Sequence, residues 1–228
     1  MERILEPEVM DTWEDAIEYD SMDFREVNTA FAEAAIAVGP PSGLILDAGT
    51  GTARIPIEIA RKRPQWQIIA VDLSANMLKV GDRNVREAGL ENRIQLDFID
   101  AKKMPYPNGH FDAIISNSIV HHLPDPIPFF DELKRLLKPN GGLFLRDLMR
   151  PDDRATVDAL VAAIGSEYND YQTKLFRDSL HAAFTVAEIR EMLDTAGLKG
   201  VKVYQSSDRH WTAERQWGPS SGGNYNNE

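Results

Sequence analysis

The chain of 228 residues has no cysteine, which excludes a disulfide framework and thiol chemistry. It has no apolar run near the roughly 18 residues that a membrane-spanning helix needs. Its first residues, Met-Glu-Arg-Ile-Leu-Glu, are unlike a signal peptide. We therefore expect a cytoplasmic protein without a membrane span.

The chain has fewer basic than acidic residues. It contains 25 Lys and Arg and 36 Asp and Glu, which gives a net charge of −11. Such a surface repels nucleic-acid phosphates unless its cations cluster. The one short cluster, Arg61-Lys62-Arg63, is typical of a solvated helix end whose cations complement the helix dipole. Nucleic acid is therefore not the expected partner. The hydrophobic content of 43% and charged content of 27% are ordinary for a globular domain.

The stretch Leu44–Arg54 gives the strongest indication of the fold, and the rest of the sequence is interpreted from it. Leu44–Leu46 is a short apolar run, typical of a strand buried on both faces. Asp47-Ala48-Gly49-Thr50-Gly51 predicts a tight turn, and a helical pattern follows. Gly49 permits a turn that a Cβ would obstruct, and Gly51 lets the backbone approach a ligand closely. This is the first strand–turn–helix of a doubly wound α/β sheet, in which ligands bind at the carboxyl ends of the strands.

Two details argue against a nucleotide-cofactor oxidoreductase. Arg54 occupies the third glycine position of the dinucleotide-binding pattern. Asp47 stands before the first glycine, where its charge would repel a pyrophosphate but attract a cation.

The remaining pattern alternates strands and helices, which predicts a parallel sheet with right-handed crossovers. After the first unit, strands are expected at 67–72, 94–99, 111–117 and 143–148, with a turn at 138–142. Two successive helices at 152–168 and 170–183, a helix at 186–196 and a hairpin of strands at 201–205 and 209–212 follow. We expect one domain over 1–217, with an N-terminal helical lid (1–40), a helical insertion (152–184) and a disordered tail (218–228). Part of the lid, 11–24, also fits a helix packed on the sheet edge.

Several motifs in this order resemble the class I S-adenosylmethionine-dependent methyltransferases, closest to the small-molecule enzymes of ubiquinone and menaquinone biosynthesis. They are Asp47–Thr52, the acid Asp72, Asp100-Ala101, Phe111-Asp112 before an apolar strand, and Leu137–Gly142. The resemblance covers 44–148, nearly half of the chain. It implies a seven-stranded Rossmann-like sheet in the order 3-2-1-4-5-7-6 with one antiparallel strand, and S-adenosylmethionine as the cofactor.

The resemblance also implies cofactor-binding positions. The methionine end would be held by Asp47, Ala48, Gly49, Thr50 and Gly51, together with Asn117, and Ser118–Leu123 would border the transferable methyl group. Asp72 and Leu73 would bind the ribose, and the interval from Gly51 to Asp72 independently fits a ribose-binding acid. Asp100 and Ala101 would bind the adenine, although Asp100 also fits a loop cap. Met77 fits either an adenine contact or the core.

Methyl transfer requires alignment of the acceptor and the methyl group, and a base only if the acceptor must lose a proton. His121 and His122 follow the fourth strand and are the candidate catalytic residues, although both also fit loop contacts. Candidate acceptor contacts are Tyr19, Arg146, Arg150 and His181; the arginines also fit structural ion pairs, and His181 fits an ordinary helix end. No metal is expected. The predicted function is methyl transfer to a small molecule by in-line displacement. The alternatives are an RNA methyltransferase and a non-catalytic S-adenosylmethionine-binding protein.

Overall fold

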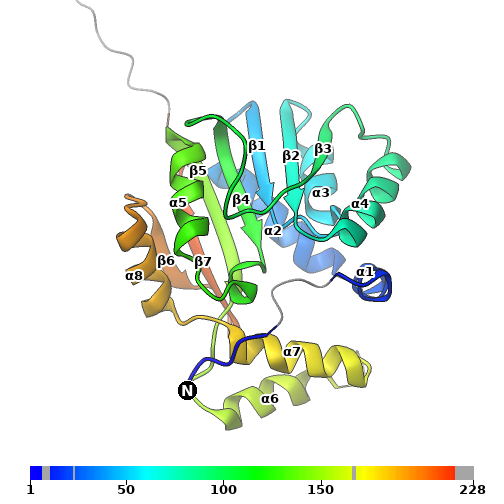
Figure 1. Cartoon of the computed structure of the whole chain (residues 1–228), viewed down its shortest axis with the longest axis vertical. Helices are drawn as coiled ribbons and strands as arrows, with labels where there is room; N and C mark the ends of the chain where they lie inside the picture. Colours follow the sequence, from blue (N-terminus) through cyan, green and yellow to red (C-terminus); the bar gives the residue numbers. More distant parts are fainter. Residues whose placement is uncertain (7–10, 23, 166–167, 219–228) are drawn as a thin grey trace, which may run out of the picture.

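The computed structural model of the protein describes residues 1–6, 11–22, 24–165 and 168–218, and its strands form one seven-stranded sheet (Figure 1). The order is β3-β2-β1-β4-β5-β7-β6. The strands are β1 (Gly43–Ala48), β2 (Trp66–Asp72), β3 (Ile94–Phe98), β4 (Phe111–Asn117), β5 (Leu137–Leu148), β6 (Lys202–Gln205) and β7 (His210–Arg215). β7 is antiparallel to β5 and β6, and the pairs among β1 to β5 are parallel. The predicted fold class, strand order and antiparallel strand are confirmed.

Helices cover both faces of this sheet (Figure 1). One face carries α2 (Arg25–Val38), α3 (Arg54–Lys62) and α4 (Ala75–Glu87), and the other carries α5 (Ile127–Leu136) and α8 (Val186–Ala196). Alternate residues of the central strands supply the two cores, because successive strand residues point to opposite faces. Ile45 packs with the α2–α3 side, and Leu46 with the α5–α8 side. The continuous apolar run of β1 is therefore explained by burial on both faces.

The predicted turn at 138–142 is wrong, because β5 begins at Leu137, directly after α5. Leu137 pairs with Phe111, and the register then shifts so that Gly142 pairs with Ala113. A Cβ on Gly142 would lie 2.7 Å from the carbonyl oxygen of Val38. The glycines at this irregularity thus permit close packing within a strand, whereas the sequence pattern alone is typical of a turn.

Beyond β5, the chain forms α6 (Arg154–Ile164) and α7 (Asp170–Ala182), which lie beyond the carboxyl ends of the parallel strands (Figure 1). The first residues of the chain lie along α7, where the amide of Ile4 donates a hydrogen bond of 3.0 Å to the carbonyl of His181. Helix α1 (Trp13–Ser21) lies against α4 through a buried cluster of Ala16, Met77 and Val80. In the parts of the chain that the structure describes, no helix is both long and apolar enough to span a membrane.

The predicted disordered tail lies, except for Gly218, outside the described residues. The amide of Gly218 donates a hydrogen bond of 2.9 Å to the carbonyl of Asn140, so this residue is held against the first residues of β5.

Candidate functional site

The turn between β1 and α3 is a conformation that requires glycine. Gly49 and Gly51 have φ of +78° and +55°, in the left-handed region. A Cβ on Gly49 would lie 2.8 Å from Cδ1 of Ile119, in the segment after β4. The amides of Gly49 and Thr50 both donate to the carbonyl of Val71, at 2.9 and 3.0 Å. The turn is therefore fixed against both neighbouring strands and has no room for a larger residue at Gly49.

Asp72, at the end of β2, accepts two backbone hydrogen bonds. Its carboxylate accepts from the amide of Gly51 and from that of Ser74, each at 2.8 Å. Ser74 in turn caps α4, because its hydroxyl accepts from the amide of Met77 at 3.2 Å. Burial raises the pKa of Asp72, and the two backbone hydrogen bonds oppose that rise. The acid thus joins the glycine turn to the start of α4.

Asp47 is a buried carboxyl group with an unsatisfied oxygen. Its side chain is 2% exposed, and among the described residues Oδ2 has no hydrogen-bond partner. Burial raises the pKa of Asp47 to about 7; the nearby Thr50 hydroxyl opposes the rise and the charge of Asp72 adds to it. A buried carboxylate without a partner is unfavourable, and a cation beside it would remove much of that cost.

Tyr19 of α1 lies over the glycine turn. Its Cε1 is 3.7 Å from the position of a Cβ on Gly51. Burial raises the pKa of Tyr19 to about 12, and the nearby charges of Asp72 and Asp47 add to the rise. The Arg54 guanidinium binds Asp20, with one contact of 2.8 Å, and so connects the first turn of α3 to α1. Arg54, which stands in place of a third glycine, therefore holds the helix that covers the turn.

The other predicted cofactor contacts lie at the ends of neighbouring strands or close to them. Asp100 accepts from the amide of Lys102 at 2.9 Å and pairs with its ammonium at 3.2 Å, so it does cap this loop. Ala101 is buried in the α5–α8 core. Met77 is 6% exposed and belongs to the cluster beneath α1. Leu73 directly follows β2, and Asn117 ends β4.

Ser118, the residue after β4, has a left-handed backbone with φ of +57°. Its amide donates to the carbonyl of Arg146 at 2.9 Å, so the residue is held against β5 where β4 ends. A non-glycine residue in this region costs on the order of 1 kcal/mol and persists where the surroundings impose it.

The candidate bases lie in a short 3₁₀ turn, η1 (Val120–His122), at the same edge of the sheet. Nδ1 of His121 contacts the Asp147 carboxylate, and Nε2 lies 3.4 Å from Oε1 of Glu6. Burial alone lowers the pKa of His121, but Asp147 and Glu6 reverse the effect and the net pKa is raised. His122 places Nδ1 3.2 Å from the same Glu6 oxygen, and its side chain is 20% exposed. His121 is therefore enclosed by carboxylates, whereas His122 retains an exposed part.

The candidate acceptor contacts do not converge. Arg150 is 7% exposed, pairs with Glu188 at 2.6 Å and donates to the carbonyl of Ala183, which is the structural ion pair left open above. Arg146 donates to the hydroxyl of Thr212 at 3.1 Å, and its guanidinium faces the Phe144 ring, 5.2 Å from the ring centre. Arg146 and Asp147 do not pair, since successive strand residues point to opposite faces.

The hydrogen bond that places His181 in the structure is made by its backbone. Its carbonyl accepts from Ile4, as described above, and its half-buried ring lies in the last turn of α7, with Nδ1 unpartnered among the described side chains.

Glu6 is the residue of this site that the sequence did not indicate. It comes from the N-terminal segment, where nothing in the periodicity relates it to a histidine after β4. Asp147, near the end of β5, could be expected at this edge from the sequence, because the carboxyl ends of parallel neighbours lie at one edge of the sheet; its contact with His121 could not.

A sheet in this strand order, with a glycine turn after β1 and an acid at the end of β2, defines a class I methyltransferase architecture. Comparisons with known proteins agree. A family model described as a methyltransferase domain matches residues 45–141. Methyltransferase GfsG of Streptomyces halstedii is 32% identical over 120 residues, which are 53% of this chain and 42% of that protein. A demethylmenaquinone methyltransferase of Listeria welshimeri is 35% identical over 109 residues, or 47% of this chain and 46% of that protein.

These matches span less than half the length of either relative. Solved structures share the fold over more of the chain. An S-adenosyl-L-methionine-dependent methyltransferase structure from Methanococcus maripaludis has a TM-score of 0.73 at 22% identity and covers 97% of this chain and 99% of its own. Phosphoethanolamine N-methyltransferase 2 of Haemonchus contortus has a TM-score of 0.69 at 16% sequence identity, and the match covers 90% of this chain and 57% of that protein's chain. Residues 45–141 thus match a methyltransferase-domain family, and the chain shares the fold of S-adenosylmethionine-dependent methyltransferase structures.

Proposed function

We propose that this protein binds S-adenosylmethionine at the edge formed by the ends of β1, β2 and β4 and transfers its methyl group to a small-molecule acceptor. The observation that carries the proposal is the unpartnered, buried Oδ2 of Asp47 beside the glycine turn. S-Adenosylmethionine carries an ammonium and a sulfonium and no phosphate, so a buried carboxylate suits it and disfavours a dinucleotide.

The chain's own residues fit the parts of this donor. Asp47, Ala48, Gly49, Thr50 and Gly51 would surround its amino-acid end, with Asn117 and Ser118 on the opposite side. Asp72 would accept from the ribose hydroxyls with the acceptor capacity that its two backbone hydrogen bonds leave, and Leu73 would adjoin it. Asp100 and Ala101 would border the adenine. The structure places Met77 beneath α1, which favours its core role over an adenine contact.

When bound, the donor supplies a methyl group already activated by a positively charged leaving group. The residues around it then have to align the acceptor and exclude water, which can contribute about 7–11 kcal/mol in favourable cases. Tyr19, which lies over Gly51, is placed to shield this site. His122, or His121 if Glu6 moves away, would accept a proton from an acceptor that must lose one.

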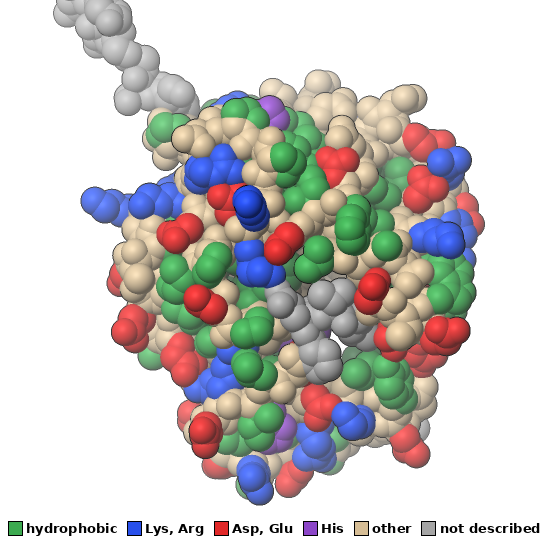
Figure 2. Space-filling model, in the orientation of Figure 1, with side chains coloured by type: hydrophobic (Ala, Val, Ile, Leu, Met, Phe, Trp, Pro, Cys, Tyr) green, Lys and Arg blue, Asp and Glu red, His purple; other side chains and the backbone are tan. Residues whose placement is uncertain are grey.

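A small-molecule acceptor is supported by two observations. One relative is named demethylmenaquinone methyltransferase. Figure 2 shows acidic and basic side chains interspersed over the face drawn, without a large basic patch of the kind that nucleic acid requires. An RNA acceptor and a purely non-catalytic role are therefore less favoured. Arg146 and His181 stay candidate acceptor contacts, and Arg150 is assigned to its ion pair with Glu188.

The proposal is tested in two stages. Calorimetric titration at pH 8 should show S-adenosylmethionine binding to the wild type and at least about tenfold weaker binding to Asp47→Asn, because a hydrogen bond or ion pair to a charged group contributes about 1.5–3 kcal/mol. Incubation of a metabolite extract with the protein and methyl-labelled donor, followed by mass spectrometry, should then reveal a labelled small molecule. No binding of the donor, or tight binding of a dinucleotide instead, would refute the assignment.

A further inference from the structure

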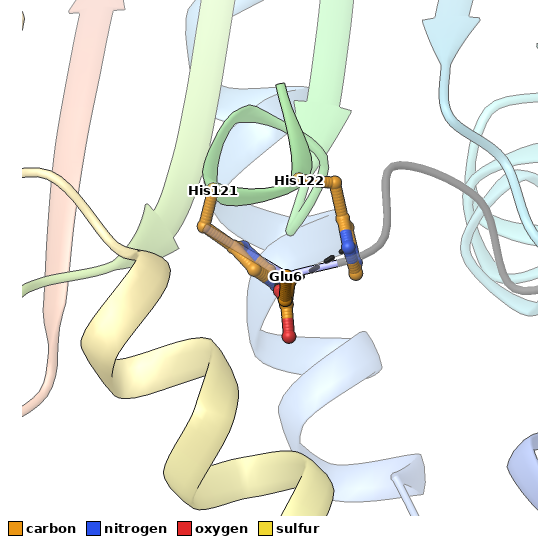
Figure 3. Close-up of side chains that lie close together, drawn as sticks. All are labelled: Glu6, His121 and His122. Carbon is orange, nitrogen blue, oxygen red and sulfur yellow. Dashed lines mark ion pairs between the residues drawn. The ribbon is translucent and has the colours of Figure 1, made fainter. Parts of the chain in front are cut away.

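Three side chains from two separate parts of the chain converge at one point. Glu6 of the N-terminal segment faces His121 and His122 of η1, and Figure 3 shows all three pointing toward one another. Oε1 of Glu6 lies 3.4 Å from Nε2 of His121 and 3.2 Å from Nδ1 of His122. One ligating atom from each residue lies within 4.8 Å of the other two.

These separations suit a shared metal ion. Zinc binds imidazole nitrogen and carboxylate oxygen at about 2.0–2.2 Å in tetrahedral geometry, which places two such ligands about 3.4 Å from each other. The two distances from Glu6 match that value. Two imidazoles and one carboxylate are also a ligand set that zinc, iron(II) and related ions use with open positions for water or substrate.

The surroundings support the same role for His121. Its Nδ1 contacts the carboxylate of Asp147, which also accepts backbone hydrogen bonds from Val120 at 2.6 Å and His121 at 3.2 Å. A proton on Nδ1 shared with a carboxylate leaves the lone pair of Nε2 directed at Glu6. This carboxylate–histidine arrangement is the usual support for a metal-ligating imidazole.

Glu6 is itself held in position. Its side chain is 7% exposed, and the hydroxyl of Ser179 in α7 lies 3.3 Å from Oε1 and 3.1 Å from Oε2, which holds the carboxylate with Oε1 toward the histidines. Arg3 donates to the carbonyls of His121 and Leu123, at 2.9 and 2.8 Å, and so fixes the N-terminal segment on the turn that carries both histidines. Among the described residues, the charges that act on His121 are the carboxylates of Glu6 and Asp147 and the guanidinium of Arg3, and Asp178 acts on Glu6. Two anions against one cation favour a divalent ion.

We propose that Glu6, His121 and His122 form a binding site for one divalent transition-metal ion of the zinc type. The ion replaces the contacts between Glu6 and the two imidazoles, and its remaining position is open to water or to an oxygen of a small ligand. The sequence pattern predicted no metal, because the carboxylate ligand reaches the histidines only through the tertiary fold. The proposal does not depend on methyl transfer, since metal binding is measured without the methyl donor.

The test uses the full chain without an affinity tag, after treatment with a chelator. Titration with Zn²⁺ by calorimetry should give one ion per chain, and Co²⁺ should give the visible absorption of a nitrogen- and oxygen-ligated site. Glu6→Gln and His122→Asn should each weaken Zn²⁺ binding by at least about tenfold, the lower limit seen when even a supporting outer residue is lost. His110→Asn is the matched control and should bind as the wild type does, because His110 precedes β4 at the opposite end of that strand.

Absence of a stoichiometric ion in the wild type, or wild-type affinity in both ligand variants, would overturn the proposal. His122 is partly exposed, so His122→Asn is the variant expected to fold normally if Glu6→Gln does not. Circular dichroism of each variant identifies any loss of affinity that comes from unfolding.

Discussion

The carboxylate of Asp72 accepts the amide hydrogen of Gly51 at 2.8 Å, so the end of β2 directly holds the turn that follows β1. Its other oxygen accepts from Ser74, the N-cap of α4. One acid thus fixes the shape of the turn and also faces the region where we place the ribose of the donor.

Replacement of Asp72 by Asn should weaken S-adenosylmethionine binding at least about tenfold. The amide group can offer only one acceptor atom, so either Gly51 or Ser74 loses its partner, and a hydrogen bond to a charged group contributes about 1.5–3 kcal/mol. Calorimetry measures the affinity. Asp82→Asn, an exposed acid of α4 paired with Arg86, is the control and should leave the affinity unchanged. Equal affinities for Asp72→Asn and wild type would remove Asp72 from the site.

Asp47 should make stability fall with rising pH in the absence of ligand. Its pKa is raised by burial to about 7 from the usual 3.8, so the folded state favours the protonated form. The contribution of Asp47 is therefore fully present below about pH 4 and is lost as pH rises through about 7. In urea unfolding, the gain of Asp47→Asn over the wild type in unfolding free energy should be smallest near pH 4, should grow as pH rises toward 7 and should be largest near pH 8. A variant that gains nothing between these pH values would contradict the raised pKa.

Gly49→Ala should destabilise the protein more than Gly109→Ala does. Both glycines have a positive φ, of +78° and +62°, at which an alanine costs roughly 1–2 kcal/mol. A Cβ on Gly49 also meets Ile119 at 2.8 Å, whereas a Cβ on Gly109 meets nothing within 4 Å. Crowding should add about 1–3 kcal/mol for Gly49 alone. Urea unfolding of the two variants measures the difference, and equal losses would show that the turn has more room than the structure allows.

At least one of His121→Asn and His122→Asn should lower kcat by about 100-fold or more on an acceptor that loses a proton, because a positioned base contributes about 10²–10⁴-fold. Affinity for the methyl donor should stay unchanged. Assays in chelator-treated buffer separate this role from that of a bound metal. His121→Asn also removes the partner of buried Asp147, so its unfolding free energy is measured alongside. Full turnover in both variants would mean that neither histidine is the base.

Much of the fold could be predicted from local pattern. The pattern of a strand, a turn and a helix can be recognised in the apolar run of β1 and in Gly49 and Gly51. Once it is recognised, the acid Asp72 at the end of the next strand can be interpreted as part of the same site. The beginning of β5 could not be predicted in the same way. Lys138–Gly142 has the composition of a turn, and only the pairing of Leu137 with Phe111 shows that this segment belongs to a strand.

The alternation of strands and helices, the glycine turn and the acids at the strand ends can be inferred from the amino-acid sequence, because each depends on residues near one another in the chain. Three contacts exist only because of the folded arrangement: Glu6 with His121 and His122, Arg54 with Asp20 of the covering helix, and Arg150 with Glu188. They join residues far apart in the chain, and no local periodicity indicates which distant segments the packing of the core brings together.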